Sequence, residues 1–191
     1  MNEQHRVLCA SDMWADAIRD LVLPWAFRDF DPADLGDDIV EIGPGPGKTT
    51  DVLHTLTASL TAVELDPDLA AQLTVRFAGT NVRVVNHDAT DLPFADGHFT
   101  GGVCFTMLHH VPTAELQDRL LAELVRVVRP GGWVVGSDSV ASDDLRGLHD
   151  GDTYNPIDPA GLPERLRRAG LDRVEVVDNE YAFRFRGVAH A

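Results

Sequence analysis

The chain has 191 residues, of which 44% are hydrophobic and 25% are charged, and its formal net charge is −15. This length and mixture are typical of one globular domain with a full hydrophobic core. The acidic charge would repel a phosphate backbone, so we expect no nucleic-acid partner. Short arginine-rich pieces, including Arg184 and Arg186, are interpreted as solvated faces.

The sequence shows no membrane, export or metal-binding pattern. It lacks a run of 18 consecutive apolar residues and an N-terminal signal sequence, so we expect a cytoplasmic protein without membrane contact. Cys9 and Cys104 show no redox or metal spacing, and Cys104 falls in a predicted buried strand. The eight histidines form no HExxH sequence and no closely spaced ligand pair, so the sequence predicts no metal site.

The N-terminal segment is predicted to contain an amphipathic helix that starts at Ser11, a good N-cap residue. Pro24 should kink or end this helix. The tryptophans on its apolar face fit two interpretations, packing against the domain core or roofing a ligand pocket. The apolar residues that recur at helical spacing are Trp14, Ile18, Leu21, Val22 and Trp25.

The middle of the chain alternates between short apolar runs and helical patterns. Such alternation indicates a parallel sheet that is covered by helices on both faces. The predicted strands span residues 39–42, 60–65, 82–85, 99–105 and 133–136. The predicted helices between them span residues 49–60, 66–78 and 113–128.

The C-terminal part is predicted to close the sheet with a hairpin. After a polar, irregular stretch at 137–157 and a short helix at 162–169, two alternating runs flank the turn at 178–180. We therefore expect an α/β fold. Its sheet should be Rossmann-like, doubly wound and mostly parallel, with seven strands and a C-terminal antiparallel hairpin.

A glycine-rich loop follows the first predicted strand. Gly43, Gly45 and Gly47 let the backbone turn sharply and approach a ligand, and the next helix start offers unpaired N–H groups. The loop ends like a P-loop, but Ile42 stands where the first glycine of that motif belongs. Lys48 occupies the place of the third glycine of a dinucleotide-binding fingerprint, which disfavours a nicotinamide oxidoreductase.

Five sequence blocks follow one another at residues 41–47, 63–66, 86–94, 107–111 and 126–132. Glu64, in the second block, lies 21 residues after Gly43, a separation at which a carboxylate reaches ribose hydroxyls. In their order and spacing the blocks resemble the class I S-adenosylmethionine (SAM)-dependent methyltransferases. The resemblance covers about residues 39–138 and implies a methyltransferase whose cofactor is SAM.

The resemblance implies which residues bind the cofactor. The glycine loop would lie against the methionine part of SAM, and Glu41 would orient its ammonium group indirectly. The residues implied for this end of the cofactor are Glu41, Gly43, Pro44, Gly45 and Gly47, with Phe105 at the end of the fourth strand.

The resemblance implies that residues at the ends of the second and third strands bind the other end of the cofactor. Glu64 would bind both ribose hydroxyls, and Leu65 would pack on the adenine ring. Asp88 would accept from the adenine amino group, and the Ala89 backbone N–H would donate to a ring nitrogen. The alternatives are a helix-capping role for Glu64, which Asp66 already fills, and a turn role for Asp88.

His109 and His110 follow the fourth strand and are the candidate catalytic residues. Methyl transfer from a sulfonium mainly demands positioning, and a base is needed only when the acceptor carries a proton of high pKa. Packing or hydrogen bonding within the protein is the alternative for each histidine, and at most one of the two is expected to face the pocket. Weaker candidates are Asp138, His149, Asp152 and Tyr154.

The sequence favours a small-molecule acceptor. Residues 105–108 do not match the Asn-Pro-Pro-Tyr-type block of methyltransferases that act on adenine or glutamine nitrogens. The glycine loop is similar to that of the RNA adenine dimethylating branch, but the missing block and the net charge argue against RNA. A catalytically silent SAM-binding protein is a further alternative.

We expect a monomer or homodimer with a helical cap (1–38), a SAM-binding core (39–138) and a substrate-side segment with the hairpin (139–191).

Overall fold

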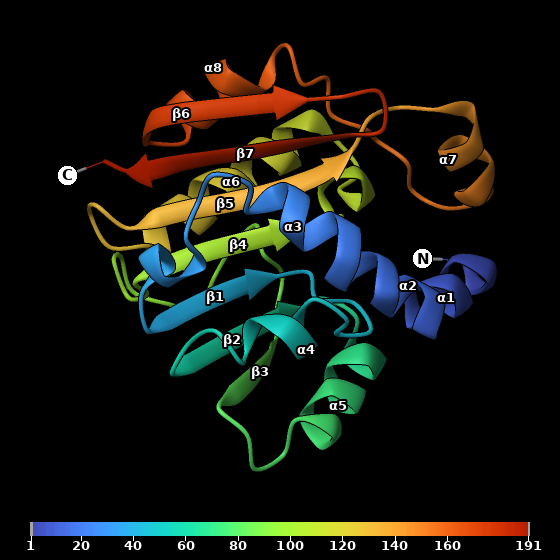
Figure 1. Cartoon of the computed structure of the whole chain (residues 1–191), viewed down its shortest axis with the longest axis horizontal. Helices are drawn as coiled ribbons and strands as arrows, with labels where there is room; N and C mark the ends of the chain where they lie inside the picture. Colours follow the sequence, from blue (N-terminus) through green and yellow to red (C-terminus); the bar gives the residue numbers. More distant parts are fainter. Residues whose placement is uncertain (1, 191) are drawn as a thin grey trace.

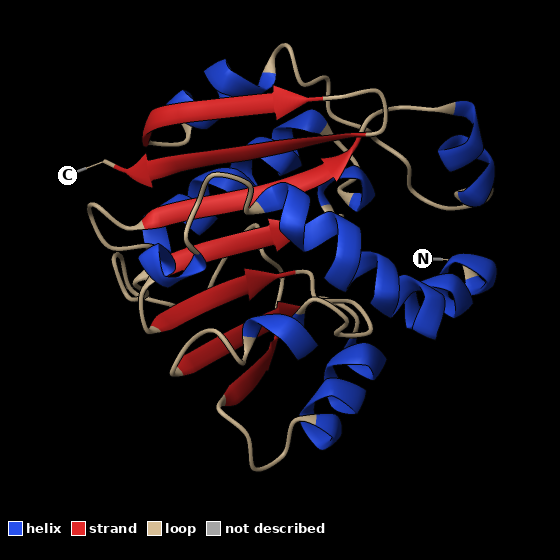
Figure 2. Ribbon diagram, viewed as in Figure 1, coloured by secondary structure: helices blue, strands red, loops and turns tan. Residues whose placement is uncertain are grey.

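The computed structural model describes residues 2–190, which build a seven-stranded sheet between two layers of helices (Figures 1 and 2). The strand order is β3-β2-β1-β4-β5-β7-β6. The first five strands are parallel, and β7 is antiparallel to both β5 and β6, so the predicted fold class is confirmed. The strands are β1 (Asp38–Ile42), β2 (Ser59–Glu64), β3 (Val82–Asn86), β4 (Gly101–Phe105), β5 (Trp133–Ser139), β6 (Leu171–Asp178) and β7 (Ala182–Ala189).

Helices cover both faces of the sheet (Figure 1). Successive residues of β1 pack against the helix layers on opposite faces of the sheet. Ile39 packs with the N-terminal segment and Leu53, whereas Val40 packs with Leu124 and Leu162. The helices are α1 (Glu3–Ala10), α2 (Asp12–Ala17), α3 (Leu23–Ala26), α4 (Thr50–Leu53), α5 (Pro67–Arg76), α6 (Ala114–Val127), α7 (Asp143–Leu148) and α8 (Leu162–Arg168). Shorter turns are a π-helical turn η1 (Ile18–Val22) and the 3₁₀ turns η2 (Pro32–Leu35) and η3 (Leu108–His110).

The N-terminal segment is more helical than predicted. Ser11 does cap a helix, α2, because its Oγ accepts a hydrogen bond from the Trp14 N–H at 3.1 Å. An earlier helix, α1, starts after Asn2, whose Oδ1 accepts from the His5 N–H at 2.8 Å. Before Pro24 the chain widens into the π-helical turn η1, a common adjustment where a proline cannot donate to the preceding turn.

The helix predicted at 49–60 is wrong in length, because α4 ends at Leu53. Asn81, just before β3, reaches across and donates its side-chain amide to the carbonyls of His54 and Thr57, at 2.8 Å each. These long-range hydrogen bonds satisfy the carbonyls that a longer helix would have used. The chain therefore leaves the helix after Leu53 and enters β2 at Ser59.

The predicted hairpin is present, and β7 also anchors the N-terminal segment. In the turn, Asn179 Oδ1 accepts from the backbone N–H groups of Tyr181 and Ala182. Arg184 donates to the Arg28 carbonyl and lies 5.2 Å from the centroid of the Trp25 ring. Its exposed fraction is 8%, so interpreting Arg184 as part of a solvated face was wrong.

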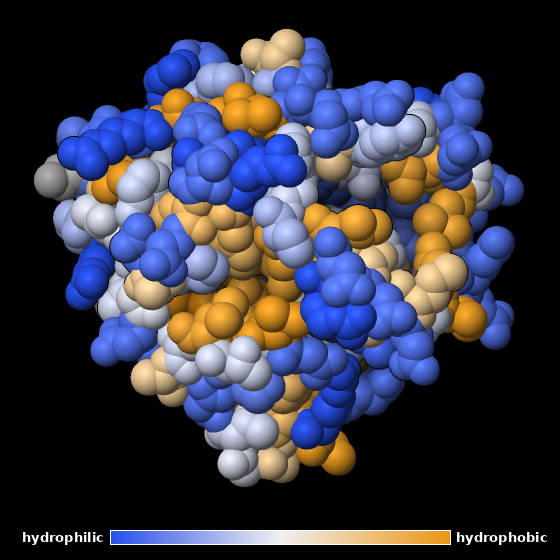
Figure 3. Space-filling view, viewed as in Figure 1, coloured by the Kyte–Doolittle hydropathy of each residue, from blue (hydrophilic) through white to orange (hydrophobic). Residues whose placement is uncertain are grey.

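The surface on the side of the N-terminal helices is mixed. Figure 3 shows apolar atoms between polar ones over the centre of this face. Within the N-terminal helices themselves, Val7, Met13 and Leu21 are each more than half exposed. In the described part of the chain, no helix is long and apolar enough to cross a membrane.

Candidate active site

The glycine loop begins directly after β1, where the Gly43 N–H still donates to the Val63 carbonyl at 2.9 Å. Its three glycines have positive φ angles of 65°, 55° and 81° at Gly43, Gly45 and Gly47. A Cβ at Gly47 would lie 2.5 Å from Leu73 Cδ2, whereas a Cβ at Gly45 would meet nothing within 4 Å. Gly47 is therefore required for packing on α5, and Gly45 leaves the backbone open to a ligand.

Glu64 ends β2 beside this loop, and only 7% of its surface is exposed. Its two carboxylate oxygens accept from the backbone N–H groups of Gly45 and Asp66, both at 2.9 Å. Burial raises the pKa of the Glu64 carboxyl, and the backbone hydrogen bonds oppose that rise. Each oxygen retains a second lone pair, so the carboxylate fits a ligand that carries a pair of hydroxyl groups.

The ends of β2 and β3 offer the groups that an adenine ring needs. Leu65 is 66% exposed despite its apolar side chain, and Asn86 fixes its backbone by donating to the Leu65 carbonyl at 2.9 Å. Asp88 is exposed, and one of its oxygens accepts from the Thr90 N–H at 2.8 Å. The backbone N–H of Ala89 has no hydrogen-bond partner within residues 2–190. This edge thus presents an apolar surface, a carboxylate and a free donor.

Glu41 supports the loop from below. It is 1% exposed and accepts hydrogen bonds from the hydroxyls of Thr49 and Thr50, the second at 2.7 Å. Burial raises the pKa of the Glu41 carboxyl to about 7, although the two hydroxyls oppose the rise. Glu41 therefore joins β1 to the start of α4 and is not among the residues that line the cavity above the loop.

A cavity of about 60 Å³ lies above the loop. The side chains of Trp14 and Ile18 line it, so the roofing interpretation holds for this part of the N-terminal segment, whereas Trp25 packs under Arg184. Small-molecule pockets usually span about 300–1,000 Å³, so this cavity has room for only part of a cofactor of the size of SAM, and the rest would lie along the open edge at Glu64 and Leu65. The lining residues are Cys9, Trp14, Ile18, Gly43, Pro44, Gly45, Pro46, Lys48, Thr49, Phe105, Thr106, Met107 and His110.

A larger hollow of about 680 Å³ lies elsewhere and is wide open to solvent. Gly36 and Asp37, just before β1, and Arg129, before β5, form part of its wall. It therefore lies at the amino ends of the strands. Ligands of open α/β sheets bind beyond the carboxyl ends of the strands. We therefore place the candidate site at the smaller cavity.

The two adjacent histidines after β4 take different positions. His110 lines the cavity, and His109 does not. The Nδ1 of His109 lies 2.6 Å from Oδ1 of Asp138, and its backbone N–H donates to Oδ2 at 3.0 Å. Burial lowers the pKa of His109, but the Asp138 carboxylate outweighs it and the pKa is raised. Burial and the neighbouring histidines lower the pKa of His110 to about 3, so its imidazole is neutral at pH 7.

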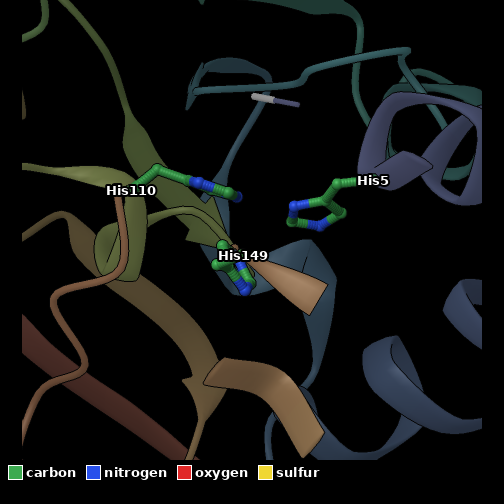
Figure 4. Close-up of side chains that lie close together, drawn as sticks. All are labelled: His5, His110 and His149. Atoms are coloured by element: carbon green, nitrogen blue, oxygen red, sulfur yellow. The ribbon is translucent and has the colours of Figure 1, made fainter. Parts of the chain in front are cut away.

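The fold adds two further histidines to His110. His5 of α1 and His149, which follows α7, turn their rings toward it, and all three side chains converge (Figure 4). One nitrogen from each ring lies within 4.8 Å of the others. His149 was a weaker candidate by sequence, and His5 was not a candidate because the helix that carries it was not predicted. The long separations along the chain give no local signal for this cluster.

Comparison with known proteins decides the family. The family described as methyltransferase domain matches residues 40–136, about half of the chain. The chain belongs to this methyltransferase family. Among solved structures, a SAM-dependent methyltransferase of Thermotoga maritima aligns over 96% of both chains with a TM-score of 0.71 and 19% identity. The methyltransferase CalH in complex with S-adenosylhomocysteine aligns over 92% of this chain and 57% of its own, with a TM-score of 0.68 and 22% identity.

The curated relatives of this methyltransferase include proteins of two kinds. A ubiquinone biosynthesis O-methyltransferase of Thiobacillus denitrificans is 27% identical over 165 residues, which cover 76% of this chain and 69% of that protein. A ribosomal RNA small subunit methyltransferase A of Acidithiobacillus ferrooxidans is 45% identical over only 60 residues, 31% of this chain and 22% of that protein. The protein is therefore a SAM-dependent methyltransferase with SAM as its cofactor, and the free groups around Glu64 and Asp88 are compatible with that cofactor.

Proposed function

We propose that this methyltransferase acts on a small-molecule acceptor. The observation that carries the proposal is the roof: Cys9, Trp14 and Ile18 of the N-terminal segment lie over the cavity at the end of the glycine loop. A polymer would need this roof removed altogether, whereas a small acceptor needs only room beside the cofactor. The match to a ubiquinone biosynthesis O-methyltransferase over 69% of its length supports the same class.

We propose further that the cofactor binds along the edge formed by the loop and the ends of β2 and β3. Gly43, Pro44 and Gly45, which line the cavity, would face the methionine part, with Phe105 beside it. Gly47 would keep the loop in this shape by packing on α5, and Glu41 braces the loop from below. The residues assigned to the ribose and adenine are Glu64, Leu65, Asp88 and Ala89. In this proposal residues 1–38 are the N-terminal helical cap, 39–138 the SAM-binding core and 139–191 the substrate-side segment with the closing hairpin.

The chemistry is an in-line displacement. When bound, SAM supplies a methyl group on a sulfonium, which leaves as a neutral thioether. The chain's own contribution is then to hold the acceptor's attacking atom in line and to exclude water. If that atom carries a proton, His110 is the imidazole that lines the cavity and can accept a hydrogen bond from it, whereas its pKa of about 3 makes it a weak base. The buried Asp138–His109 pair lies directly behind, with 4.2 Å between the centroids of the two histidine rings.

The RNA alternative rests on the 45% identity to a ribosomal RNA methyltransferase. That match covers 60 residues, and the net charge of −15 would repel a phosphate backbone. Measuring whether a methylated product forms distinguishes an enzyme from a SAM-binding protein without turnover.

The test has a binding stage and a turnover stage. Calorimetric titration should show binding of SAM and of its demethylated product, with NAD as the negative control. Transfer of a labelled methyl group should then be measured to phenols and quinols, to amines, and to RNA. Transfer to one of the small-molecule classes is the expected result. Transfer to RNA alone would overturn the proposal, and SAM binding without any transfer would favour the silent alternative.

A further inference from the structure

We propose that His5, His110 and His149 form a binding site for one zinc ion at the acceptor side of the cavity. The three residues come from α1, from η3 and from the end of α7, and their rings converge on one point (Figure 4). One nitrogen of each ring lies within 4.8 Å of the other two. Sequence motifs do not mark this site, because it is built by the fold.

The free nitrogens of the cluster point to a ligand. His149 Nδ1 lies 2.6 Å from the Leu145 carbonyl, so this nitrogen carries the proton and Nε2 presents its lone pair. That Nε2 is buried without a hydrogen-bond partner, and so is Nδ1 of His5. Both residues are more than nine-tenths buried, with exposed fractions of 3% and 6%. Buried polar atoms are normally satisfied, and coordination to one ion would satisfy both.

The donor set selects the metal. Three imidazoles suit zinc and other late first-row divalent ions, whereas Mg²⁺ and Ca²⁺ prefer oxygen ligands. Zinc–nitrogen bonds of about 2.0–2.1 Å place the nitrogens of a tetrahedral site roughly 3.4 Å apart. The nitrogens lie within 4.8 Å of one another, so they need to approach by at most about 1.4 Å.

The position of the site gives it a role beyond the methyl transfer proposed above. Since His110 also lines the cavity, a bound ion would stand beside the acceptor. Three histidines leave one position of a tetrahedral ion for water or for an oxygen, nitrogen or sulfur atom of the acceptor. The ion would also hold α1 and the segment around His149 together over the cavity. Zinc binding can be measured on cofactor-free protein, so failure of this site and failure of the proposed function are distinguishable.

The experiment uses untagged protein of residues 1–191 that has been stripped with chelator and then titrated with Zn²⁺. We expect one bound equivalent and a rise in Tm of roughly 5–10 °C at a 100-fold excess over Kd. Co²⁺ should give the visible absorption of a tetrahedral site, and Mg²⁺ should give no shift in Tm. A wild-type protein that binds neither Zn²⁺ nor Co²⁺ would overturn the proposal without any variant being made.

The variants assign the ligands. His5→Gln, His110→Gln and His149→Gln should each weaken zinc binding at least tenfold. His190→Gln is the matched control, because it removes an exposed histidine whose Nδ1 lies 2.6 Å from Asp172 and should leave binding unchanged. Cys9 lies one helical turn after His5 on α1 but is not among the residues whose ligand atoms lie together, so Cys9→Ser should also leave binding unchanged. Unchanged binding in the three glutamine variants, or its loss in Cys9→Ser, contradicts the three-histidine site.

Discussion

The proposed cofactor side and the proposed acceptor side of the site are built in different ways. On the cofactor side, backbone groups dominate: Glu64 accepts from the N–H groups of Gly45 and Asp66, and Ala89 keeps a free N–H. On the acceptor side, side chains meet from segments far apart in the chain, such as His5, His110 and His149. The first is a property of three adjacent parallel strands, and the second depends on how the N-terminal helices pack.

This difference indicates which part of the site is common to the family and which part is particular to the chain. The methyltransferase domain match covers residues 40–136, which contain the cofactor side together with His110. His5 and His149 lie outside that range. We therefore expect substitutions on the cofactor side to change SAM binding, and substitutions of the histidine cluster to leave it in place.

The largest expected effect is that of Glu64→Ala. Loss of two hydrogen bonds to a charged group, at about 1.5–3 kcal/mol each, should weaken SAM binding by more than about 100-fold in calorimetric titration. Glu64→Gln retains one oxygen acceptor and should lose less. Zinc binding should be unchanged in both variants, which would sharpen the separation of the two sides. An unchanged affinity for SAM in Glu64→Ala would show that the ribose assignment is wrong.

The next effect concerns Glu41 and the pH dependence of stability. Because burial raises its pKa from 4.5 to about 7 in the folded state, its stabilising contribution is complete below pH 4.5 and is lost as the pH rises through 7. The total is on the order of 3 kcal/mol. In urea unfolding, wild type should therefore lose stability relative to Glu41→Gln between pH 5 and pH 8. Parallel profiles of the two proteins would contradict a buried, titrating Glu41.

The sequence predicts the features that depend on short-range spacing and misses those that depend on contacts between distant segments. The sheet, the loop and the position of Glu64 depend on short-range spacing, and the strand order confirms the predicted fold. The length of α4 was missed because Asn81 caps it from 24 to 27 residues away. The burial of Arg184 depends on contacts with Arg28, 156 residues distant. His5 was missed for a local reason, since the helix cap at Asn2 was not recognised.

The smallest expected effects come from alanine substitutions in the glycine loop. They distinguish a glycine that is needed for packing from one that leaves the backbone open to a ligand. Gly45→Ala, Gly47→Ala and the control Gly79→Ala all place alanine at a positive φ, which costs about 1 kcal/mol. Only Gly47→Ala also drives a Cβ to 2.5 Å from Leu73, so its free energy of unfolding should fall by about 2 kcal/mol. Gly45→Ala should match Gly79→Ala in stability, because both positions are open, and yet weaken SAM binding. If Gly45→Ala binds SAM as tightly as Gly79→Ala does, the backbone at Gly45 does not face the cofactor, and the assignment of the glycine loop to the methionine part of SAM is wrong.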